Sequence, residues 1–179
     1  MQMAARSLRL TWFHELVAKG PGQLAMAHHA DDAIETFFMG LVQGMGLHGW
    51  GSIPVRSGPF IRPLLSVHRS HILAYALANG ISWREDRSNT DTKYLRNRVR
   101  HELLPLLNTW RPGTDRNLAR NVRLSRELGE LAQQTMAGII DGLLPEADGT
   151  LRVPLDRILG PAPLLVMHHL LRDKGFHPD

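Results

Sequence analysis

The spacing of apolar residues along this chain predicts a mixed α/β fold. Two short apolar runs, at residues 24–27 and 60–65, fit strands, and the first has the character of a buried strand. Elsewhere apolar residues recur three or four positions apart, as they do on one side of a helix. This spacing predicts helices over residues 3–18, 31–42, 66–78, 115–140 and 164–172, and a further one from Tyr94 to the break at Pro112-Gly113, with a kink at Pro105.

Individual residues allow more detailed predictions for two of these helices and for the domain boundary. Ser66 is a suitable N-cap for the helix over 66–78. The helix over 115–140 has a predicted buried side, formed by Leu118, Val122, Leu128, Leu131 and Met136. The pattern changes from mixed α/β to all-helical near residue 108. We therefore predict one domain over 1–108 and a helical region over 109–179.

Polar residues concentrate at one turn, residues 28–32, which joins the first strand to the next helix. Ligands of open α/β sheets bind at such carboxyl ends of strands. Asp32 and Glu35 lie three residues apart, so they share a helical face. They could bind a cation or an ammonium group together. Alternatively Asp31 or Asp32 caps the helix and Glu35 reaches back in a capping box, which the spacing alone favours.

The two histidines of this turn allow a metal-based alternative. On a strand, His28 and His29 would point to opposite faces, so they could not both bind one ion without distortion. One would be a buried, hydrogen-bonded side chain and the other would face a ligand. With Asp31 and Asp32 nearby, a site for Zn²⁺ or for Mg²⁺-bound phosphates is conceivable. The corresponding hypothesis is a metal-dependent phosphohydrolase that uses His28, Asp31 and Asp32.

Basic residues are concentrated in one block of the chain. The net charge is +4, and residues 93–126 hold nine basic and two acidic residues against 12 basic and 15 acidic ones elsewhere. Such a block indicates a surface for a polyanion. Its arginines form two groups: Arg96, Arg98 and Arg100, then Arg116, Arg120 and Arg123. They would contact nucleic-acid phosphates or, alternatively, form a solvated helix face paired with Glu127 and Glu130.

Several classes of protein are disfavoured by what the sequence lacks. It has no cysteine, which excludes disulfides and thiolate metal sites. No apolar run approaches the roughly 20 residues of a membrane span, and charged residues interrupt the N-terminal segment where a signal peptide would be apolar. It also has no Gly-x-Ser-x-Gly elbow of a serine hydrolase. These features favour an intracellular protein that does not span a membrane.

Five stretches, in matching order and spacing, resemble the motifs of tRNA(Ile)-lysidine synthases. Residues 25–36 are similar to the family's "AHHxDDxxET", residues 44–49 to "GxGLxG", and residues 96–105 to "RNRIRHELLP". The stretches Ile61-Arg62-Pro63-Leu64 and 83–89 match two further motifs. The family belongs to the ATP-pyrophosphatases with a Rossmann-like domain. The resemblance therefore implies an incomplete Rossmann-like parallel sheet followed by an all-helical region.

The resemblance also implies a reaction, its cofactors and its partners. Members of this family use ATP and Mg²⁺ to adenylate the C2 oxygen of the wobble cytidine in a tRNA(Ile) with a CAU anticodon. The ε-amine of free L-lysine then displaces AMP, and the product is lysidine. A cytoplasmic location is implied as well, because the substrate is tRNA.

Carried over residue by residue, the motifs assign roles to the candidate positions. Asp32 and Glu35 would hold the lysine ammonium as the catalytic pair. His28, His29 and Arg9 would lie near ATP, although Leu10 stands where the family has Tyr after that arginine. Asp31 would lie near Mg²⁺ through ATP. The tRNA contacts would come from Arg96, Arg98, Arg100, Arg116, Arg120 and Arg123. Alternatively, the arginines of residues 96–100 would reach the nucleotide phosphates.

One motif of the family is absent from these 179 residues, namely the "SGGxDS" loop that binds pyrophosphate. We therefore expect an N-terminally truncated form that alone neither binds ATP tightly nor forms lysidine. A sheet without its first strands would expose a strand edge and helix faces, so a partner is expected, either a missing N-terminal segment or a second copy in a homodimer. The alternative is a non-catalytic tRNA-binding fragment in which residues 93–126 remain functional.

Overall fold

The computed structural model describes residues 2–20, 22–44, 52–84, 94–140, 150, 152–160 and 162–173. The elements of the first half of the chain are α1 (Gln2–Ala18), β1 (Leu24–Ala25), α2 (Ala30–Gln43), β2 (Arg56–Ser57), β3 (Phe60–Ile61) and α3 (Arg69–Ala78). Those of the second half are α4 (Leu95–Arg98), the π-helix η3 (Val99–Leu103), α5 (Leu104–Trp110), α6 (Thr114–Ile140), α7 (Leu155–Ile158) and α8 (Pro163–Asp173). Residues 45–51 and 85–93, which hold parts of two motifs, lie outside the described residues.

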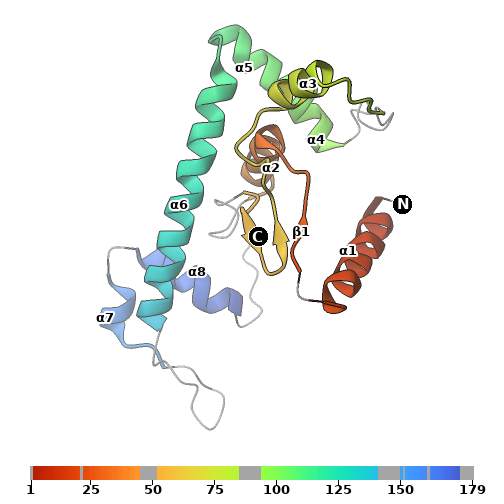
Figure 1. The fold of residues 1–179 in the computed structure, drawn as a ribbon. Helices are drawn as coiled ribbons and strands as arrows, with labels where there is room; N and C mark the ends of the chain where they lie inside the picture. The colour runs from red at the N-terminus through yellow and green to blue at the C-terminus, as the bar shows by residue number, and fades with distance from the viewer. Residues whose placement is uncertain are drawn as a thin grey trace.

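A small three-stranded sheet supports the turn at residues 28–32. Its strand order is β1-β3-β2, with β1 parallel to β3 and β2 antiparallel to β3. Helix α2 connects the two parallel strands and lies beside the sheet (Figure 1). The mixed α/β class is confirmed, but the first strand is not buried, because Ala25 is exposed and Leu24 is only half-buried. Strand β1 pairs only with β3 among the described residues, so it forms an edge.

The start of α3 differs from the prediction. Residues 63–66 form turns, in which the Leu65 and Val67 amides donate to the carbonyls of Arg62 and Leu64. The helix begins at Arg69, with His68 as its N-cap, so the prediction of Ser66 as the cap is wrong. The Arg69 amide donates to a carboxylate from α2, as described below, and this contact takes the place of a local cap.

A continuous helical stretch from α4 to α5 runs through Pro105. Proline provides no amide hydrogen and clashes with the carbonyl four residues earlier. The π-helix η3 directly precedes it, and within η3 the Leu104 amide donates to the carbonyl of Val99, five residues back. A wide π-helical turn is therefore found where a kink at Pro105 was predicted. Such π-helical turns are frequent at functional sites.

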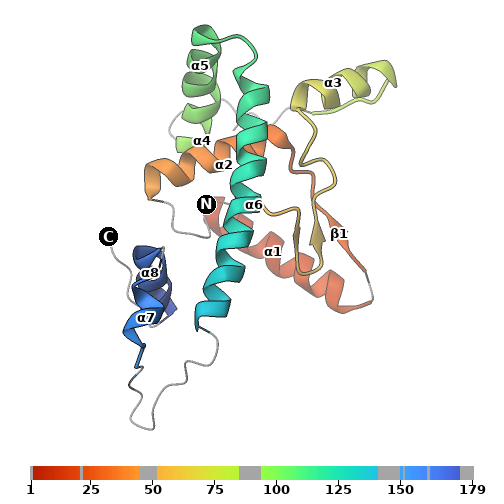
Figure 2. The ribbon, with the colours of Figure 1, turned by 90° about the vertical axis from the view of Figure 1, so that its left-hand side faces the viewer.

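Two apolar clusters share the long helix α6, which Figure 2 shows reaching from α2 to α8. Val122 packs with Ala33, Ile34 and Leu65, while Met136 packs with α8. Because α6 contributes to the same cluster as α2, the division at residue 108 is not visible as a gap in packing and stays a prediction.

The predicted buried side of α6 is partly wrong. Val122 and Met136 are buried, but Leu128 and Leu131 are 60% and 59% exposed. At about 100° per residue, Leu128 and Leu131 point roughly 120° and 180° away from Val122 around the helix, whereas Met136 points within about 40° of it. The apolar residues of α6 thus form a wider stripe around the helix than the part that α2 and α8 bury.

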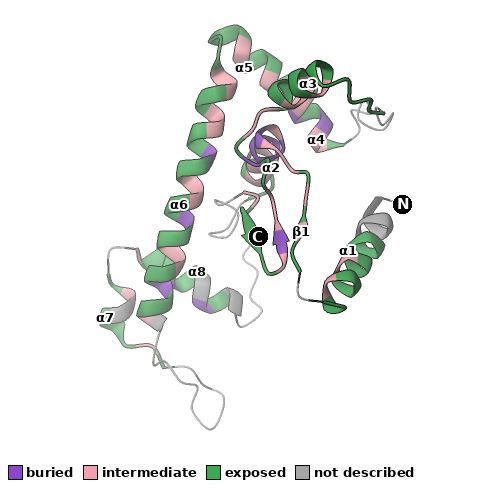
Figure 3. Ribbon diagram, in the orientation of Figure 1, coloured by how far each residue is buried: buried purple, intermediate pink, exposed green. Residues whose placement is uncertain are grey.

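Helix α1 is exposed along most of its described length (Figure 3). Leu8, Trp12 and Leu16 are 73%, 55% and 41% exposed. The His14 ring meets Phe60 edge-on at a centroid distance of 4.9 Å, which connects α1 to the sheet. This agrees with the expectation of exposed helix faces. Among the described residues no helix is both long and apolar enough to cross a membrane.

Candidate functional site

The turn at residues 28–32 begins helix α2 with a histidine cap. His29 has extended backbone angles, its Nδ1 accepts from the Asp32 amide at 3.3 Å, and its own amide donates to Asp32 Oδ2 at 3.0 Å. The predicted capping box, with an aspartate as the cap and Glu35 reaching back, is therefore wrong. His29 and Asp32 form the box instead, so Glu35 and the second oxygen of Asp32 remain available for other contacts.

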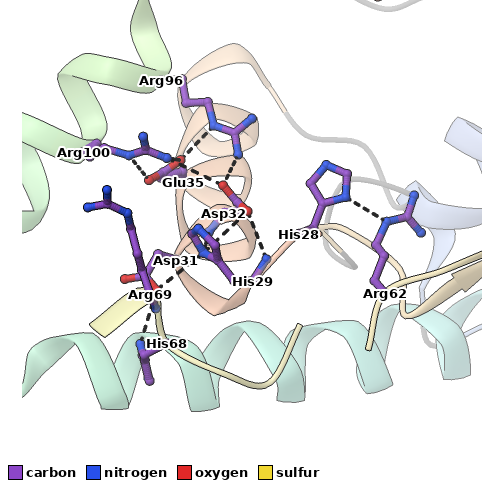
Figure 4. A network of polar contacts seen from close by, with 10 residues as sticks. All are labelled: His28, His29, Asp31, Asp32, Glu35, Arg62, His68, Arg69, Arg96 and Arg100. Carbon is purple, nitrogen blue, oxygen red and sulfur yellow. Dashed lines mark hydrogen bonds and ion pairs between the residues drawn. The ribbon is translucent and has the colours of Figure 1, made fainter. Parts of the chain in front are cut away.

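Those two carboxylates bind two arginines from the neighbouring helical stretch (Figure 4). Arg96 bridges them, donating from Nη2 to Asp32 Oδ1 at 2.7 Å and from Nε to Glu35 Oε2 at 2.8 Å. Arg100 donates to both oxygens of Glu35, at 2.6 and 2.9 Å, and its Nη2 lies 3.6 Å from Asp32 Oδ1. Two carboxylates and two guanidiniums thus form one neutral, charge-assisted network.

Burial makes this network a strong feature of the fold. The Glu35 side chain is 1% exposed and that of Asp32 is 12% exposed, whereas Arg100 and Arg96 are 24% and 38% exposed. The hydrogen bond with Glu35 raises the pKa of Arg100 above its ordinary value, against the opposing effect of burial. The arginines therefore compensate carboxylates that would otherwise be costly to bury.

The three arginines of the first group make different contacts. Arg96 and Arg100 share one face and reach α2, while Arg98 points away and pairs with Glu102 at 3.2 Å, where both side chains are exposed. The contact between these arginines and the carboxylates was not predicted from the sequence. The spacing of the charged residues is nevertheless compatible with this contact. Two carboxylates three residues apart on one helix can reach two arginines four residues apart on a facing helix.

Asp31 turns away from this pair and caps α3. Its Oδ2 accepts from the Arg69 amide at 2.8 Å and lies 3.6 Å from the Nδ1 atoms of both His29 and His68. No sequence pattern indicated that His68 or Arg69 would join the site. With one oxygen already engaged, Asp31 could contact Mg²⁺ only together with ligands such as nucleotide phosphates.

The donor set for the metal hypothesis does not come together. His28 contacts Arg62, Asp31 contacts the start of α3, and Asp32 contacts Arg96. No group of three or more His, Asp or Glu side chains in the described part of the chain has the arrangement of a metal site. The described contacts give the phosphohydrolase hypothesis no support.

His28 lies on the other side of the turn from the arginine network. Its Nδ1 accepts from Arg62 Nε at 3.3 Å, so the neutral ring presents Nε2–H as a donor. Burial lowers the pKa of His28 below its ordinary value of 6.5, and this effect outweighs the attraction of Asp32. The charges of Arg62, Arg96 and His29 lower it further.

This pKa shift predicts that stability falls with acidification. Below pH 6.5 the unfolded chain protonates His28 before the folded chain does, so the free energy of unfolding falls from there down to the lowered pKa. Urea unfolding measured from about pH 7.5 to about pH 5.5 would show a steeper decline in the wild type than in His28→Gln. Parallel declines would contradict this assignment.

The remaining candidate residues lie apart from the carboxylate pair. Arg9 is on exposed α1, beyond β1 from α2 in Figure 1. Arg116, Arg120 and Arg123 are exposed along α6. The structure therefore brings together Asp32, Glu35, Arg96 and Arg100, and it leaves Arg9 and the second arginine group on separate surfaces.

Two clefts of similar size adjoin the turn but differ in charge. One, of about 490 Å³, is lined by both signs: Glu35, Asp31 and Asp115 against Arg69 and Arg100. We call it the mixed-charge cleft. The other, of about 470 Å³, has four arginines and no carboxylate among the described residues that line it.

Comparison with known proteins identifies the class to which this architecture belongs. Residues 1–107, more than half of the 179, match the PP-loop domain family, so the chain belongs to that family. The resemblance noted from the five motifs is confirmed by relatives with a more specific name. The chain is 44% identical over 127 residues to a tRNA(Ile)-lysidine synthase of Geobacter sulfurreducens, covering 69% of this chain and 27% of the relative.

Two further relatives carry the same name. A tRNA(Ile)-lysidine synthase of Parabacteroides distasonis is 37% identical over 98% of this chain and 40% of its own length. One of Neisseria gonorrhoeae is 42% identical over 71% of this chain and 29% of its own length. The chain thus spans 27–40% of the lengths of these three curated relatives.

Proposed function

We propose that this chain supplies the lysine-binding and RNA-contacting parts of a cytoplasmic enzyme that joins lysine to the wobble cytidine of tRNA(Ile) with a CAU anticodon. The observation that carries the proposal is the buried pair Asp32 and Glu35, which already binds cationic side chains at 2.6–2.9 Å. A rigid carboxylate pair is what a lysine ammonium requires. The names of the relatives support the choice of RNA, and the family resemblance of the motifs suggests lysine as the amino acid.

In this proposal the carboxylates position the nucleophile and take its proton. The ε-ammonium must lose a proton before its nitrogen can attack C2 of the cytidine, and the carboxylate beside it accepts that proton. When bound, ATP with Mg²⁺ supplies the activation of the C2 oxygen, which departs with AMP as the carbon–nitrogen bond forms. His28 Nε2–H is a donor suited to phosphate oxygens, and Asp31 is the residue suited to contact Mg²⁺ there.

Lysine enters this site in exchange for Arg96. The two carboxylates are already balanced by two guanidiniums, so a third cation would leave a buried excess of positive charge. Arg96 is the more exposed arginine and makes one hydrogen bond to each carboxylate, whereas Arg100 makes two to Glu35. Arg96 therefore leaves, and its released guanidinium becomes available to an RNA phosphate.

The mixed-charge cleft suits the rest of the amino acid. Free lysine carries an α-carboxylate and an α-ammonium as well as its side-chain charge. The cleft presents guanidiniums of Arg69 and Arg100 and carboxylates of Glu35, Asp31 and Asp115 within one space. Both signs of charge are thus available to a zwitterion that reaches Glu35 from this side.

The proposal predicts that the chain discriminates L-lysine from norleucine, which has the same carbon chain without the ε-ammonium. Hydrogen bonds to charged groups contribute about 1.5–3 kcal/mol, so lysine should bind roughly 10- to 100-fold more tightly. Isothermal titration calorimetry of both amino acids with the 179-residue chain measures this. Equal affinity for the two would refute an ammonium site.

A non-catalytic RNA-binding role is the second candidate, favoured by the exposed arginines of α6. It requires RNA binding that survives Asp32→Asn and no affinity for lysine. The lysine titration separates the two candidates. That the 179 residues alone form no lysidine stays a prediction.

A further inference from the structure

In the second cleft beside the turn, all the charged residues among the described lining residues are arginines. It lies between α6 and the segment that follows β3, and its four arginines come from both sides: Arg62 from that segment, and Arg120, Arg123 and Arg126 from α6. Ser66 adds a hydroxyl, and none of the described residues that line the cleft is a carboxylate. We call it the arginine cleft. Its charge contrasts with the mixed-charge cleft on the other side of the turn.

The floor of the arginine cleft is apolar and rigidly held. It is formed by small and branched side chains: Ala30, Ala33, Pro63, Leu65, Ala119 and Val122. Ala33, Leu65 and Val122 also belong to the buried cluster between α2 and α6. A rim of guanidiniums above an apolar floor fits a nucleotide, with phosphate at the rim and base on the floor.

Burial affects two arginines of this cleft more strongly than the charges around them do. Burial lowers the pKa of Arg62, and it lowers that of Arg126 more than the nearby charges of Glu130 and Glu127 raise it. Arg62 uses Nε for His28 and Nη1 for the carbonyl of Pro54. An anion in the cleft would offset this cost of desolvation.

We propose that the arginine cleft binds one nucleotide of single-stranded RNA, with its phosphate on Arg120 and Arg123. This rests on the proposed function, which makes RNA the substrate. An extended polyanion fits better than a free nucleotide, because the positive charge continues along α6 to Arg116. The interval from Arg116 to Arg126 spans about 15 Å of helix axis. Arg62 then connects the bound phosphate to His28 in the turn.

The test compares two arginine variants in binding to fluorescently labelled single-stranded RNA. Arg120→Gln/Arg123→Gln removes two rim charges, and Arg56→Gln/Arg152→Gln, which removes two exposed arginines that do not line the cleft, is the matched control. The cleft variant should bind at least 10-fold more weakly, and its slope of log affinity against log salt should fall by about 1.4, as expected for two single-strand phosphate contacts. The control variant should change affinity less than threefold.

Other outcomes overturn the cleft assignment. If Arg56→Gln/Arg152→Gln weakens RNA binding as much as Arg120→Gln/Arg123→Gln, binding follows the net charge of the chain and not the cleft. If duplex RNA of the same sequence loses as much affinity as the single strand, no base enters the cleft. If inorganic phosphate or ATP competes fully with RNA, the cleft is a site for small anions. Lysine affinity should be unchanged in the cleft variant, so failure here is distinguishable from failure of the proposed function.

Discussion

Replacement of Glu35 by glutamine is expected to lower the free energy of unfolding by about 3 kcal/mol, the lower end of the range for breaking a buried ion pair. Glu35 is 1% exposed and accepts three hydrogen bonds from Arg96 and Arg100. Glutamine keeps the shape but leaves both guanidiniums without their main counter-charge. Because Arg100 is 24% exposed, water reduces part of the penalty. Urea unfolding monitored by circular dichroism measures the change.

The control for this experiment is Glu102→Gln, in the helical stretch that carries Arg96 and Arg100. Glu102 pairs with Arg98 at 3.2 Å, and the side chains are 53% and 61% exposed. Exposed pairs contribute about 0–1 kcal/mol, so the control should remain close to the wild type. Similar losses in both variants would mean that the network around Glu35 is not buried as described.

Replacement of Arg96 by glutamine is expected to strengthen lysine binding by about 10-fold. The variant removes the cation that occupies the carboxylate pair and keeps Arg100 in place. An internal hydrogen bond to a charged group is worth about 1.5–3 kcal/mol, and lysine need no longer compete with Arg96 for these bonds. Calorimetric titration with L-lysine measures the dissociation constant directly.

The sign of this effect is informative. If Arg96 were a permanent part of the lysine site, its loss would weaken binding. Arg98→Gln is the matched control, because Arg98 carries the same charge two residues away but pairs with Glu102 on the exposed face. It should leave the affinity for lysine unchanged. Weaker binding in Arg96→Gln than in Arg98→Gln would contradict the exchange.

Much of the fold follows from local pattern. The helices at residues 2–18, 30–43 and 163–173 lie within a few residues of their predicted spans, because apolar spacing and turn residues act over short distances. The capping of α2 was assigned wrongly, since aspartate is the usual cap and histidine a rare one. The antiparallel strand β2 was not foreseen, as two residues carry too little pattern.

The carboxylate pair and the arginine pair were predicted separately, and only the tertiary fold brings them together. Sequence spacing placed Asp32 with Glu35 and Arg96 with Arg100, but the two pairs are separated by 61–65 residues. No local sequence pattern indicates that the carboxylate pair binds the arginine pair. Likewise Asp31 was assigned to the ligand from its neighbours, while its main partner is the Arg69 amide, 38 residues away.

The central claim is that Asp32 and Glu35 form the ammonium site for lysine. Its most direct test is the dissociation constant of L-lysine for the 179-residue chain and for Asp32→Asn. Asp32→Asn keeps the shape of the side chain, but removes one of the two charges that hold the ammonium. The claim predicts affinity lower by roughly 10- to 100-fold. An unchanged dissociation constant in the folded variant would contradict it.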